Sequence, residues 1–215
     1  MIELNRLYNE NCLKTMKRIP DKFVDLLLTD PPYAIGMNYD TYEDTEENWF
    51  ALMADFIPEA RRIAKMVIMP SCQIRFLEWI YKNHPPDWLL CWYKGSVGHN
   101  SYIGFNDWEP HLVYGRVHNK MNMHDYFQTK SSPKLGTNDH PCPKPMEWAK
   151  WLIIKATKPN EIVYDPFSGS GVTLQVAKFS KRQWIGSEIS KKYCTDAINN
   201  INQTKGLFST TEKLF

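Results

Sequence analysis

Short apolar runs alternate with segments of helical periodicity along the first half of the chain. Residues 23–28 are apolar except for one aspartate, a pattern typical of a strand that is buried on both faces. Apolar residues recur at helical spacing in 49–62, and short apolar runs follow at 66–69 and 87–93. Because strands and helices alternate, we predict a mainly parallel sheet with helices on both faces.

Residues 94–138 break this rhythm. The segment is rich in glycine, asparagine, histidine and aromatic residues, and it contains one clear apolar run at 111–114. A loop of this length in a compact domain usually has a function or forms an inserted module. Basic residues lie among its aromatic residues, which favours a nucleic-acid surface, while a surface excursion with a small core of its own fits the pattern equally well.

The alternation returns in the last third of the chain. We expect five further elements there: helix 146–158, strand 161–164, helix 172–179, strand 184–188 and helix 191–201. A strand, a glycine-rich turn, a helix and a second strand with a terminal acid make up the nucleoside-binding half of a Rossmann-like sheet.

Composition and charge limit the kinds of protein to which this chain can belong. The 215 residues are 43% hydrophobic and 23% charged, which suits one domain with a full core. The net charge is +2, so contact with a polyanion would need local clustering of basic residues. The sequence shows no signal-peptide core, no bilayer-spanning stretch and no CxxC pair among its five cysteines. We therefore expect an intracellular, cytoplasmic protein with reduced cysteines, no membrane partner and no metal site.

The stretch Thr29-Asp30-Pro31-Pro32-Tyr33 directly follows the apolar run 23–28. Its two prolines end ladder pairing and stiffen the loop, so a carboxylate and an aromatic ring are presented at the carboxyl end of a central strand. Open α/β sheets bind their ligands at that edge. An ordinary strand-to-loop transition is the alternative, because aspartate and proline are common in turns. The next residues, 34–47, carry an acidic cluster, and we expect them to form a solvated surface loop.

A second motif, Asp165-Pro166-Phe167-Ser168-Gly169-Ser170-Gly171, forms the glycine-rich turn. Gly169 and Gly171 would let the backbone approach a ligand closely, and Glu188 stands where an acid binds ribose hydroxyls. The turn lacks the third glycine of G-x-G-x-x-G and has no Walker lysine, so a pyrophosphate or triphosphate ligand is disfavoured.

Together the two motifs resemble those of the amino-group DNA methyltransferases that use S-adenosylmethionine. The catalytic motif precedes the cofactor motif, as in the beta subgroup of these enzymes. The resemblance covers the chain except 94–138, where the family keeps a variable target-recognition region. It implies a single α/β domain over 1–215 with a circularly permuted Rossmann-like methyltransferase fold, built on a mainly parallel sheet of the seven-stranded type. Residues 94–138 would be a short inserted target-recognition region.

The resemblance also implies roles for individual residues. The catalytic residues would be Asp30, Pro31, Pro32 and Tyr33. S-Adenosylmethionine would be bound by Asn11, Cys12, Asp30, His140, Lys144, Pro145, Asp165, Pro166, Phe167, Ser168, Gly169, Ser170, Gly171, Thr173 and Glu188. Asn11 replaces the acid of the family's Gly-Asp-Cys-Leu, and its amide would hydrogen-bond the adenine ring instead. Contacts to DNA are expected from Lys94, Arg116, Lys120, Lys130 and Lys134.

The implied reaction is direct methyl transfer to the exocyclic N6 amino group of adenine in a specific DNA sequence. The lone pair of such an amine is delocalised into the ring, so the site must accept the amino hydrogens. The Asp30 carboxylate would accept one hydrogen and the Pro31 carbonyl the other, while Tyr33 stacks on the base. The base must be flipped out of the duplex. The chemistry needs no covalent enzyme adduct and no metal.

Rival functions differ from this interpretation in the residues that they need. Cytosine N4 methyltransferases are similar but usually have serine where Asp30 stands. Cytosine C5 methylation needs a cysteine nucleophile, and neither Cys72 nor Cys142 has the right context. Protein glutamine methyltransferases have a loop that begins with asparagine and follows the cofactor motif. RNA as substrate, and a non-catalytic protein that binds DNA or cofactor, stay open.

The resemblance makes double-stranded DNA the expected partner. It is compatible with a homodimer and with a cognate restriction endonuclease.

Overall fold

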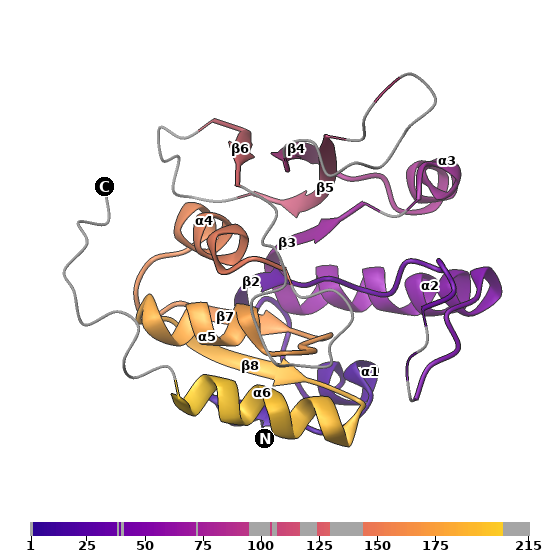
Figure 1. The fold of residues 1–215 in the computed structure, drawn as a ribbon. Coiled ribbons are helices and arrows are strands. Elements are labelled where there is room, and N and C mark those ends of the chain that lie inside the picture. Colours follow the sequence, from indigo (N-terminus) through magenta and orange to yellow (C-terminus); the bar gives the residue numbers. More distant parts are fainter. Residues whose placement is uncertain are drawn as a thin grey trace.

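The computed structural model describes residues 2–37, 39, 41–71, 73–94, 104, 107–116, 124–129 and 144–203. The strands are β1 (Arg6–Tyr8), β2 (Val24–Leu28), β3 (Ala64–Pro70), β4 (Trp88–Tyr93), β5 (Trp108–Gly115), β6 (Tyr126–Gln128), β7 (Ile162–Asp165) and β8 (Gln183–Ser187). The helices are α1 (Cys12–Met16), α2 (Glu46–Ile63), α3 (Ile74–Asn83), α4 (Met146–Ala156), α5 (Val172–Phe179) and α6 (Lys191–Gln203). Figure 1 shows these elements around one central sheet.

The sheet has eight strands in the order β1-β8-β7-β2-β3-β5-β4-β6. The run from β1 to β3 is parallel throughout, whereas β5 is antiparallel to both of its neighbours. From β2 the chain continues outward to β3, and from β7 it continues in the opposite direction to β8. The strand order therefore reverses between β2 and β7, and ligands bind at the carboxyl ends of strands at such a reversal.

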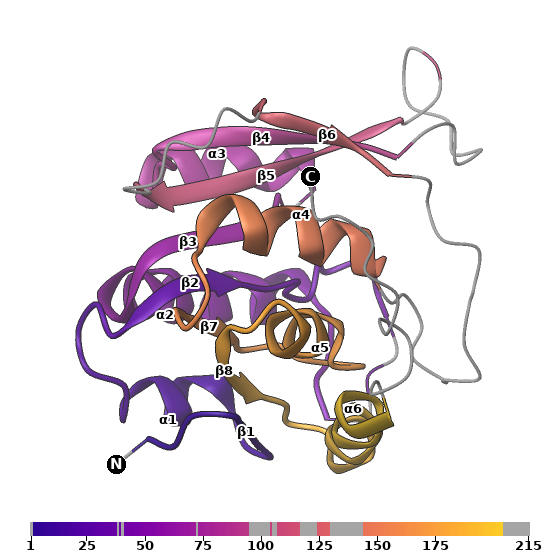
Figure 2. The same ribbon diagram turned by 90° about the vertical axis from the view of Figure 1, so that its left-hand side faces the viewer.

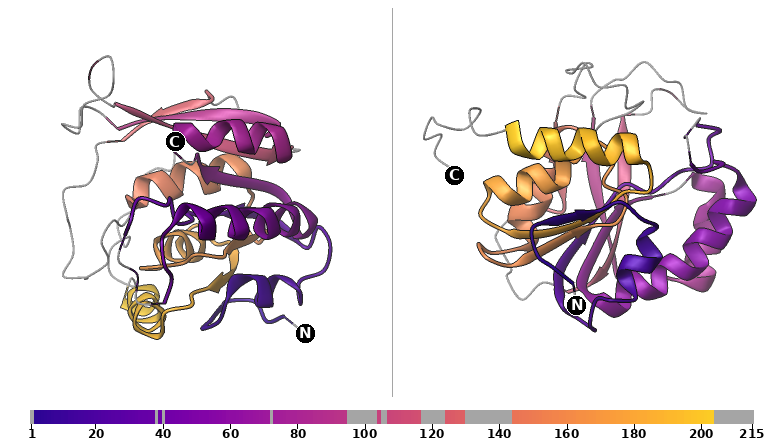
Figure 3. Two further views of the ribbon diagram at one scale, coloured as in Figure 1. Left: turned by 90° about the vertical axis from the view of Figure 1, so that its right-hand side faces the viewer. Right: turned by 90° about the horizontal axis from the view of Figure 1, so that it is seen from below.

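Helices cover both faces of the sheet, as Figures 2 and 3 show. One core cluster lies under α4, α5 and α6, and a second lies under α1, α2 and α3. Strand β2 contributes to both clusters, because Leu26 and Leu28 belong to the first and Leu27 to the second. All three side chains are fully buried. The predicted fold class, α/β with a mainly parallel sheet covered on both faces, is confirmed.

The position of β5 was not predicted. It is longer than the apolar run at 111–114, and it lies between β3 and β4 instead of beyond them. Its side chains Leu112 and Tyr114 are buried against the α2–α3 side of the sheet. Two strands of the predicted insert, β5 and β6, thus belong to the central sheet. Much of 94–138 lies outside the described residues, so its part in target recognition stays a prediction.

No helix among the described residues is long and apolar enough to cross a membrane.

Candidate active site

The two sequence motifs meet at the carboxyl edge of the sheet. Strands β2 and β7 are parallel neighbours, so the loops that follow them emerge side by side. Thr29 Oγ1 donates a hydrogen bond to Asp165 Oδ1 at 2.7 Å, and the Phe167 amide donates to Thr29 Oγ1 at 3.3 Å. The two loops therefore converge at one rim of the sheet, and Thr29 joins them.

Asp30 lies between a tyrosine and a lysine. The Tyr33 hydroxyl donates a hydrogen bond to Asp30 Oδ1, and Lys144 Nζ is 3.4 Å from the same oxygen. Burial raises the pKa of the Asp30 carboxyl, and the positive charge of Lys144 opposes that rise. Both contacts are made by Oδ1, so within the described part of the chain Oδ2 has no hydrogen-bond partner and can accept one from a ligand.

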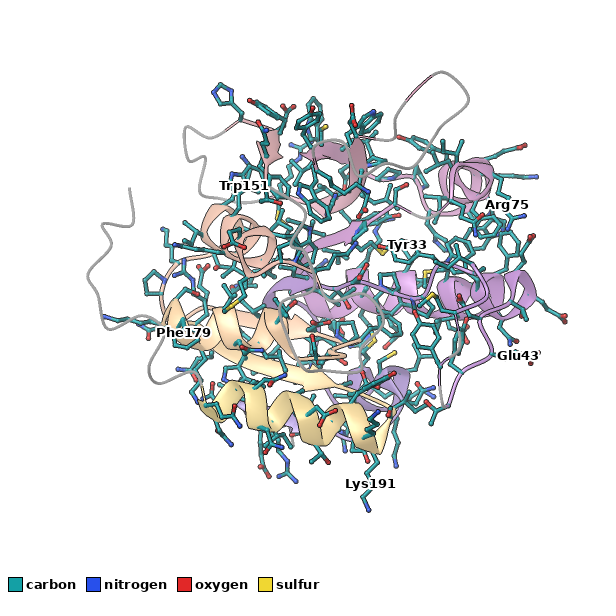
Figure 4. All side chains as sticks on the ribbon, viewed as in Figure 1. Tyr33, Glu43, Arg75, Trp151, Phe179 and Lys191 are labelled. Atoms are coloured by element: carbon teal, nitrogen blue, oxygen red, sulfur yellow. The ribbon has the colours of Figure 1, made fainter. Side chains whose placement is uncertain are left out.

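The loop after Pro32 is held by an acid that we expected to be solvated. The Asp44 side chain is buried and accepts hydrogen bonds from the amides of Ala34 (2.8 Å), Ile35 (3.0 Å) and Met37 (3.1 Å). The expectation of a solvated acidic face is thus wrong for Asp44, because three backbone donors replace its water. Gln73 adds hydrogen bonds to the carbonyls of Tyr33 (2.8 Å) and Ala34 (2.7 Å). These contacts hold the backbone at Tyr33 in place, and Figure 4 shows Tyr33 near the centre of the view.

The loop 165–171 is closed by its own hydrogen bonds. Asp165 is buried, and burial raises the pKa of its carboxyl to about 7, although hydrogen bonds from Thr29, Thr173 and the Phe167 amide act against the rise. The Ser168 amide donates to the Ser187 carbonyl at 3.0 Å, and the Ser168 hydroxyl donates to the Asp165 carbonyl at 2.9 Å. Asp165 and Ser168 thus stabilise the conformation of the loop through hydrogen bonds to protein groups.

Glu188 follows β8 and is anchored through both carboxylate oxygens. Oε2 accepts from the Gly169 amide and Oε1 from the Ser190 amide, each at 2.8 Å. The side chain is 8% exposed. The carboxylate is therefore held in a fixed orientation at the end of β8.

The close approach that the structure shows at Gly171 is to a helix. A Cβ atom at Gly171 would lie 2.9 Å from the Cβ of Ala197 in α6, and its φ of +83° is in the left-handed region. Gly186 in β8 is similarly crowded, since a Cβ there would lie 2.5 Å from Leu174 and 2.8 Å from the Ser168 hydroxyl. Glycine at these two positions lets α6 pack against the loop and α5 pack against β8. A role of Gly171 toward a ligand stays a prediction.

Replacing Gly171 by alanine should lower the free energy of unfolding by about 2–5 kcal/mol, because a left-handed φ costs about 1–2 kcal/mol and overpacking about 1–3 kcal/mol. Ala197→Gly alone should cost about 1 kcal/mol of helix stability. In the double variant the closest contact, with the Ala197 Cβ, is gone, so the combined loss should be smaller than the sum of the two single losses. Urea unfolding of the four proteins measures this, and simple additivity would contradict the proposed contact.

Asn11 and Cys12 lie beside this edge but are used by the fold. The Asn11 side chain accepts a hydrogen bond from the Leu13 amide at 2.9 Å and so caps α1. The Cys12 side chain is buried, and burial raises the pKa of its thiol to about 12. Their predicted contacts with a cofactor stay predictions.

The segment before α4 brings Lys144 to the Asp30 carboxylate. Pro145 is the N-cap residue of α4. Lys144 contacts Asp30 and also Glu109 of β5, with 3.1 Å between Nζ and Oε1. His140 lies outside the described residues.

The residues expected to bind DNA do not form one surface in the described part of the chain. Lys94 follows β4 and pairs with Glu109 at 3.3 Å. Arg116 follows β5, which runs antiparallel to β3 and β4, so Arg116 lies at the opposite edge from Lys94 and Asp30. Lys120, Lys130 and Lys134 lie outside the described residues.

Four residues that shape the site were missed by the sequence reasoning: Thr29, Asp44, Glu109 and Gly186. Thr29 stood inside the quoted motif, and its hydroxyl directly before Asp30 was the available signal. The contacts of Asp44 and Glu109 are made with residues that local patterns do not relate to them. Among the described residues, no group of three or more histidine, cysteine, aspartate or glutamate side chains could hold a metal ion.

A family model described as DNA methylase, for methyltransferases of the N6 and N4 type, matches residues 75–199, more than half of the chain. The chain belongs to this family. The resemblance predicted from the two motifs is thereby confirmed, and the reaction is methylation of DNA.

Known relatives of this DNA methylase differ in the base that they modify. The DNA adenine methyltransferase YhdJ of Escherichia coli is 27% identical, over 89% of this chain and 80% of its own. Among solved structures, the PvuII DNA methyltransferase, named as cytosine-N4-specific, has a TM-score of 0.71 at 16% identity and covers 94% of this chain and 92% of its own. M1.HpyAVI, solved as a complex with SAM, has a TM-score of 0.65 at 24% identity and covers 91% and 98%. Both structural likenesses establish the fold.

Proposed function

We propose that this DNA methylase transfers the methyl group of S-adenosylmethionine to the N6 amino group of adenine in a specific sequence of double-stranded DNA. The observation that carries the proposal is the bridge from Thr29 to Asp165. It joins the loop that presents Asp30 to the loop that contains Gly169, whose amide donates a hydrogen bond to Glu188. Both loops lie at the reversal of strand order, where α/β sheets bind ligands.

The residues at this edge suit S-adenosylmethionine, the cofactor of the family. Glu188 presents a fixed carboxylate at the end of the strand next to β7, where an acid binds ribose hydroxyls. The loop 166–171 contains no lysine or arginine, so it is not built for phosphates. The carboxylates of Asp30 and Glu188 favour a ligand with positive charge. When bound, the cofactor supplies a methyl group on a positively charged sulfur.

The chain's own residues prepare the nucleophile. An exocyclic amine attacks poorly while its lone pair is conjugated with the ring. Oδ2 of Asp30 can accept one amino hydrogen and the Pro31 carbonyl the other, which turns the lone pair toward the methyl group. Because the loop is fixed by Asp44 and Gln73, these acceptors are oriented before the base arrives, and preorganised dipoles are among the largest contributors to catalysis. Tyr33 would stack on the flipped base.

Adenine is favoured over cytosine by Asp30, since the cytosine N4 enzymes that the chain resembles usually have serine at this position. YhdJ is named as an adenine methyltransferase, whereas the PvuII methyltransferase shares the fold and is named for cytosine N4. Methylation of cytosine N4 is therefore the second candidate. Lys120, Lys130 and Lys134 are the proposed contacts to DNA phosphates. Lys94 is less suited because Glu109 balances its charge.

The decisive experiment incubates the purified protein with duplex DNA and tritium-labelled S-adenosylmethionine, followed by digestion to nucleosides and chromatography. We expect label in N6-methyldeoxyadenosine. Label in N4-methyldeoxycytidine would replace adenine by cytosine as substrate, and label only when RNA is offered would exclude DNA. Cofactor binding without transfer to any of these would indicate a non-catalytic protein on the same fold.

A further inference from the structure

The Lys144 ammonium lies between two carboxylates that come from different strands. Nζ is 3.4 Å from Oδ1 of Asp30, after β2, and 3.1 Å from Oε1 of Glu109, in β5. It also donates to the Tyr33 hydroxyl at 3.4 Å. The Lys144 side chain is only 13% exposed, so these groups replace most of its water. A cation is thus held against the carboxylate that must accept the hydrogens of the base.

Glu109, the second carboxylate that contacts this cation, is itself held in a fixed position. It lies opposite Trp92 of β4, and its second oxygen, Oε2, is 3.3 Å from Lys94 Nζ. Burial acts to raise the pKa of Glu109, but Lys144, His111 and Lys94 lower that pKa overall, so the side chain stays ionised. Two residues further along β5, His111 Nε2 accepts a hydrogen bond from Trp148 Nε1 of α4 at 2.7 Å. This buried bond ties β5 to the helix that follows Lys144.

We propose that Glu109 is a positioning residue for catalysis: it holds Lys144 beside Asp30, and Lys144 keeps Asp30 negatively charged. Its role in the reaction rests on the proposed function, because a neutral Asp30 carboxyl would lose the charge with which it accepts the amino hydrogens. The proposal also gives part of the segment 94–138 a place beside the reacting atoms, since Glu109 comes from it.

The charges around Asp30 act in opposite directions. Burial raises the pKa of Asp30 and Lys144 lowers it, while the charge of Glu109 raises it and the Tyr33 hydroxyl lowers it. Asp165, across the rim, is a further acid that interacts with Asp30. Glu109 therefore has two effects on Asp30, a direct repulsion and an indirect stabilisation through Lys144. Lys144 is in direct contact with Asp30, and Coulomb interactions weaken with distance, so the indirect effect should dominate.

The test follows the titration of Asp30 by carbon NMR on protein labelled at aspartate Cγ, with the resonance assigned by its loss in Asp30→Asn. Lys144→Met should raise the Asp30 midpoint by about one pH unit or more, because a neighbouring cation lowers the pKa of a carboxyl by about 1–3 units. Glu109→Ala should shift the midpoint upward by less. Glu109→Gln keeps an acceptor oxygen for Lys144 and removes the repulsion, so its midpoint should lie at or below that of the wild type.

The double variant Lys144→Met/Glu109→Ala distinguishes positioning from other effects. Without Lys144 there is no cation to position, so the loss of Glu109 should cause no further rise and should lower the midpoint slightly. Lys65→Met is the matched control, because Lys65 pairs at 2.6 Å with Asp25, near the amino end of β2 and away from Asp30. In Lys65→Met, the titration midpoint of Asp30 should equal that of the wild type. Thermal melts of each variant verify that it is folded.

A downward shift in Glu109→Ala alone would overturn the proposal, because direct repulsion would then be the only effect of Glu109. So would an unchanged Asp30 midpoint in Lys144→Met. These titrations need neither DNA nor cofactor, so they stand even where the methylation assay fails. Where methylation is observed, the acidic limb of the single-turnover rate should move with the NMR midpoint in every variant.

Discussion

Asp30→Ala should reduce the rate of methyl transfer at saturating DNA and cofactor by about 10²- to 10³-fold or more, the loss typical of removing one preorganised group that stabilises the transition state. The variant retains the Pro31 carbonyl, but nothing replaces the acceptor at Oδ2. The affinity for S-adenosylmethionine, measured by calorimetry, should change by less than about tenfold, because Glu188 and the loop 165–171 are untouched and hold their own hydrogen bonds.

Asp30→Asn is the near-isosteric companion of this variant. It keeps one acceptor oxygen but no charge, so its rate should lie between those of the wild type and Asp30→Ala. Asp21→Ala is the control for the loss of a carboxylate, because Asp21 is 76% exposed and precedes the amino end of β2. If Asp30→Ala lost cofactor binding together with activity, it would contradict the proposal that the Asp30 loop serves catalysis while the loop 165–171 and Glu188 bind the cofactor.

Sequence patterns predicted the elements around the cofactor loop closely. Helix α5 spans Val172–Phe179, the range expected from the sequence, and α6 begins at Lys191 after a cap by Ser190, whose hydroxyl accepts from the Tyr193 amide at 3.3 Å. These elements are determined by local features, namely apolar periodicity, a glycine before the helix and a capping hydroxyl. Local features can be read from a single sequence.

The order of the strands could not be read in the same way. The run at 111–114 predicted a strand, yet nothing in it says that the strand pairs with β3 on one side and β4 on the other. Such pairing is decided by which distant surfaces bury each other. The contact between Glu109 and Lys144 depends on that placement, because only a β5 beside β3 brings Glu109 to the edge where Asp30 lies.

The environment of Asp44 could not be read from the sequence pattern either. In the sequence it is one of several acids in a polar segment, and a solvated face is the usual interpretation of such a cluster. In the structure it is buried, because three backbone amides in 34–37 turn toward it. The turn includes Ala34 with a φ of +53°, which a pattern of polar and apolar residues does not reveal. The motif was visible in the sequence, but the residues that hold it rigid were not.

Glu188→Ala should weaken binding of S-adenosylmethionine by about 10²-fold or more, since a hydrogen bond to a charged group contributes about 1.5–3 kcal/mol. Part of that loss has a structural origin, because the amides of Gly169 and Ser190 also lose their acceptor. Glu147→Ala is the matched control: Glu147 is exposed in the first turn of α4, and its removal should leave the affinity unchanged.

A ligand that lacks the ribose hydroxyls separates the direct contact from the structural one. Calorimetry would compare S-adenosylhomocysteine with its 2′,3′-dideoxy analogue on the wild type and on Glu188→Ala. If Glu188 binds the hydroxyls, the wild type should prefer the ribose form by about 10- to 100-fold, and the variant should lose nearly all of this preference. A preference that survives unchanged in Glu188→Ala would mean that the carboxylate only shapes the loop through Gly169, and that the ribose is bound elsewhere along the edge.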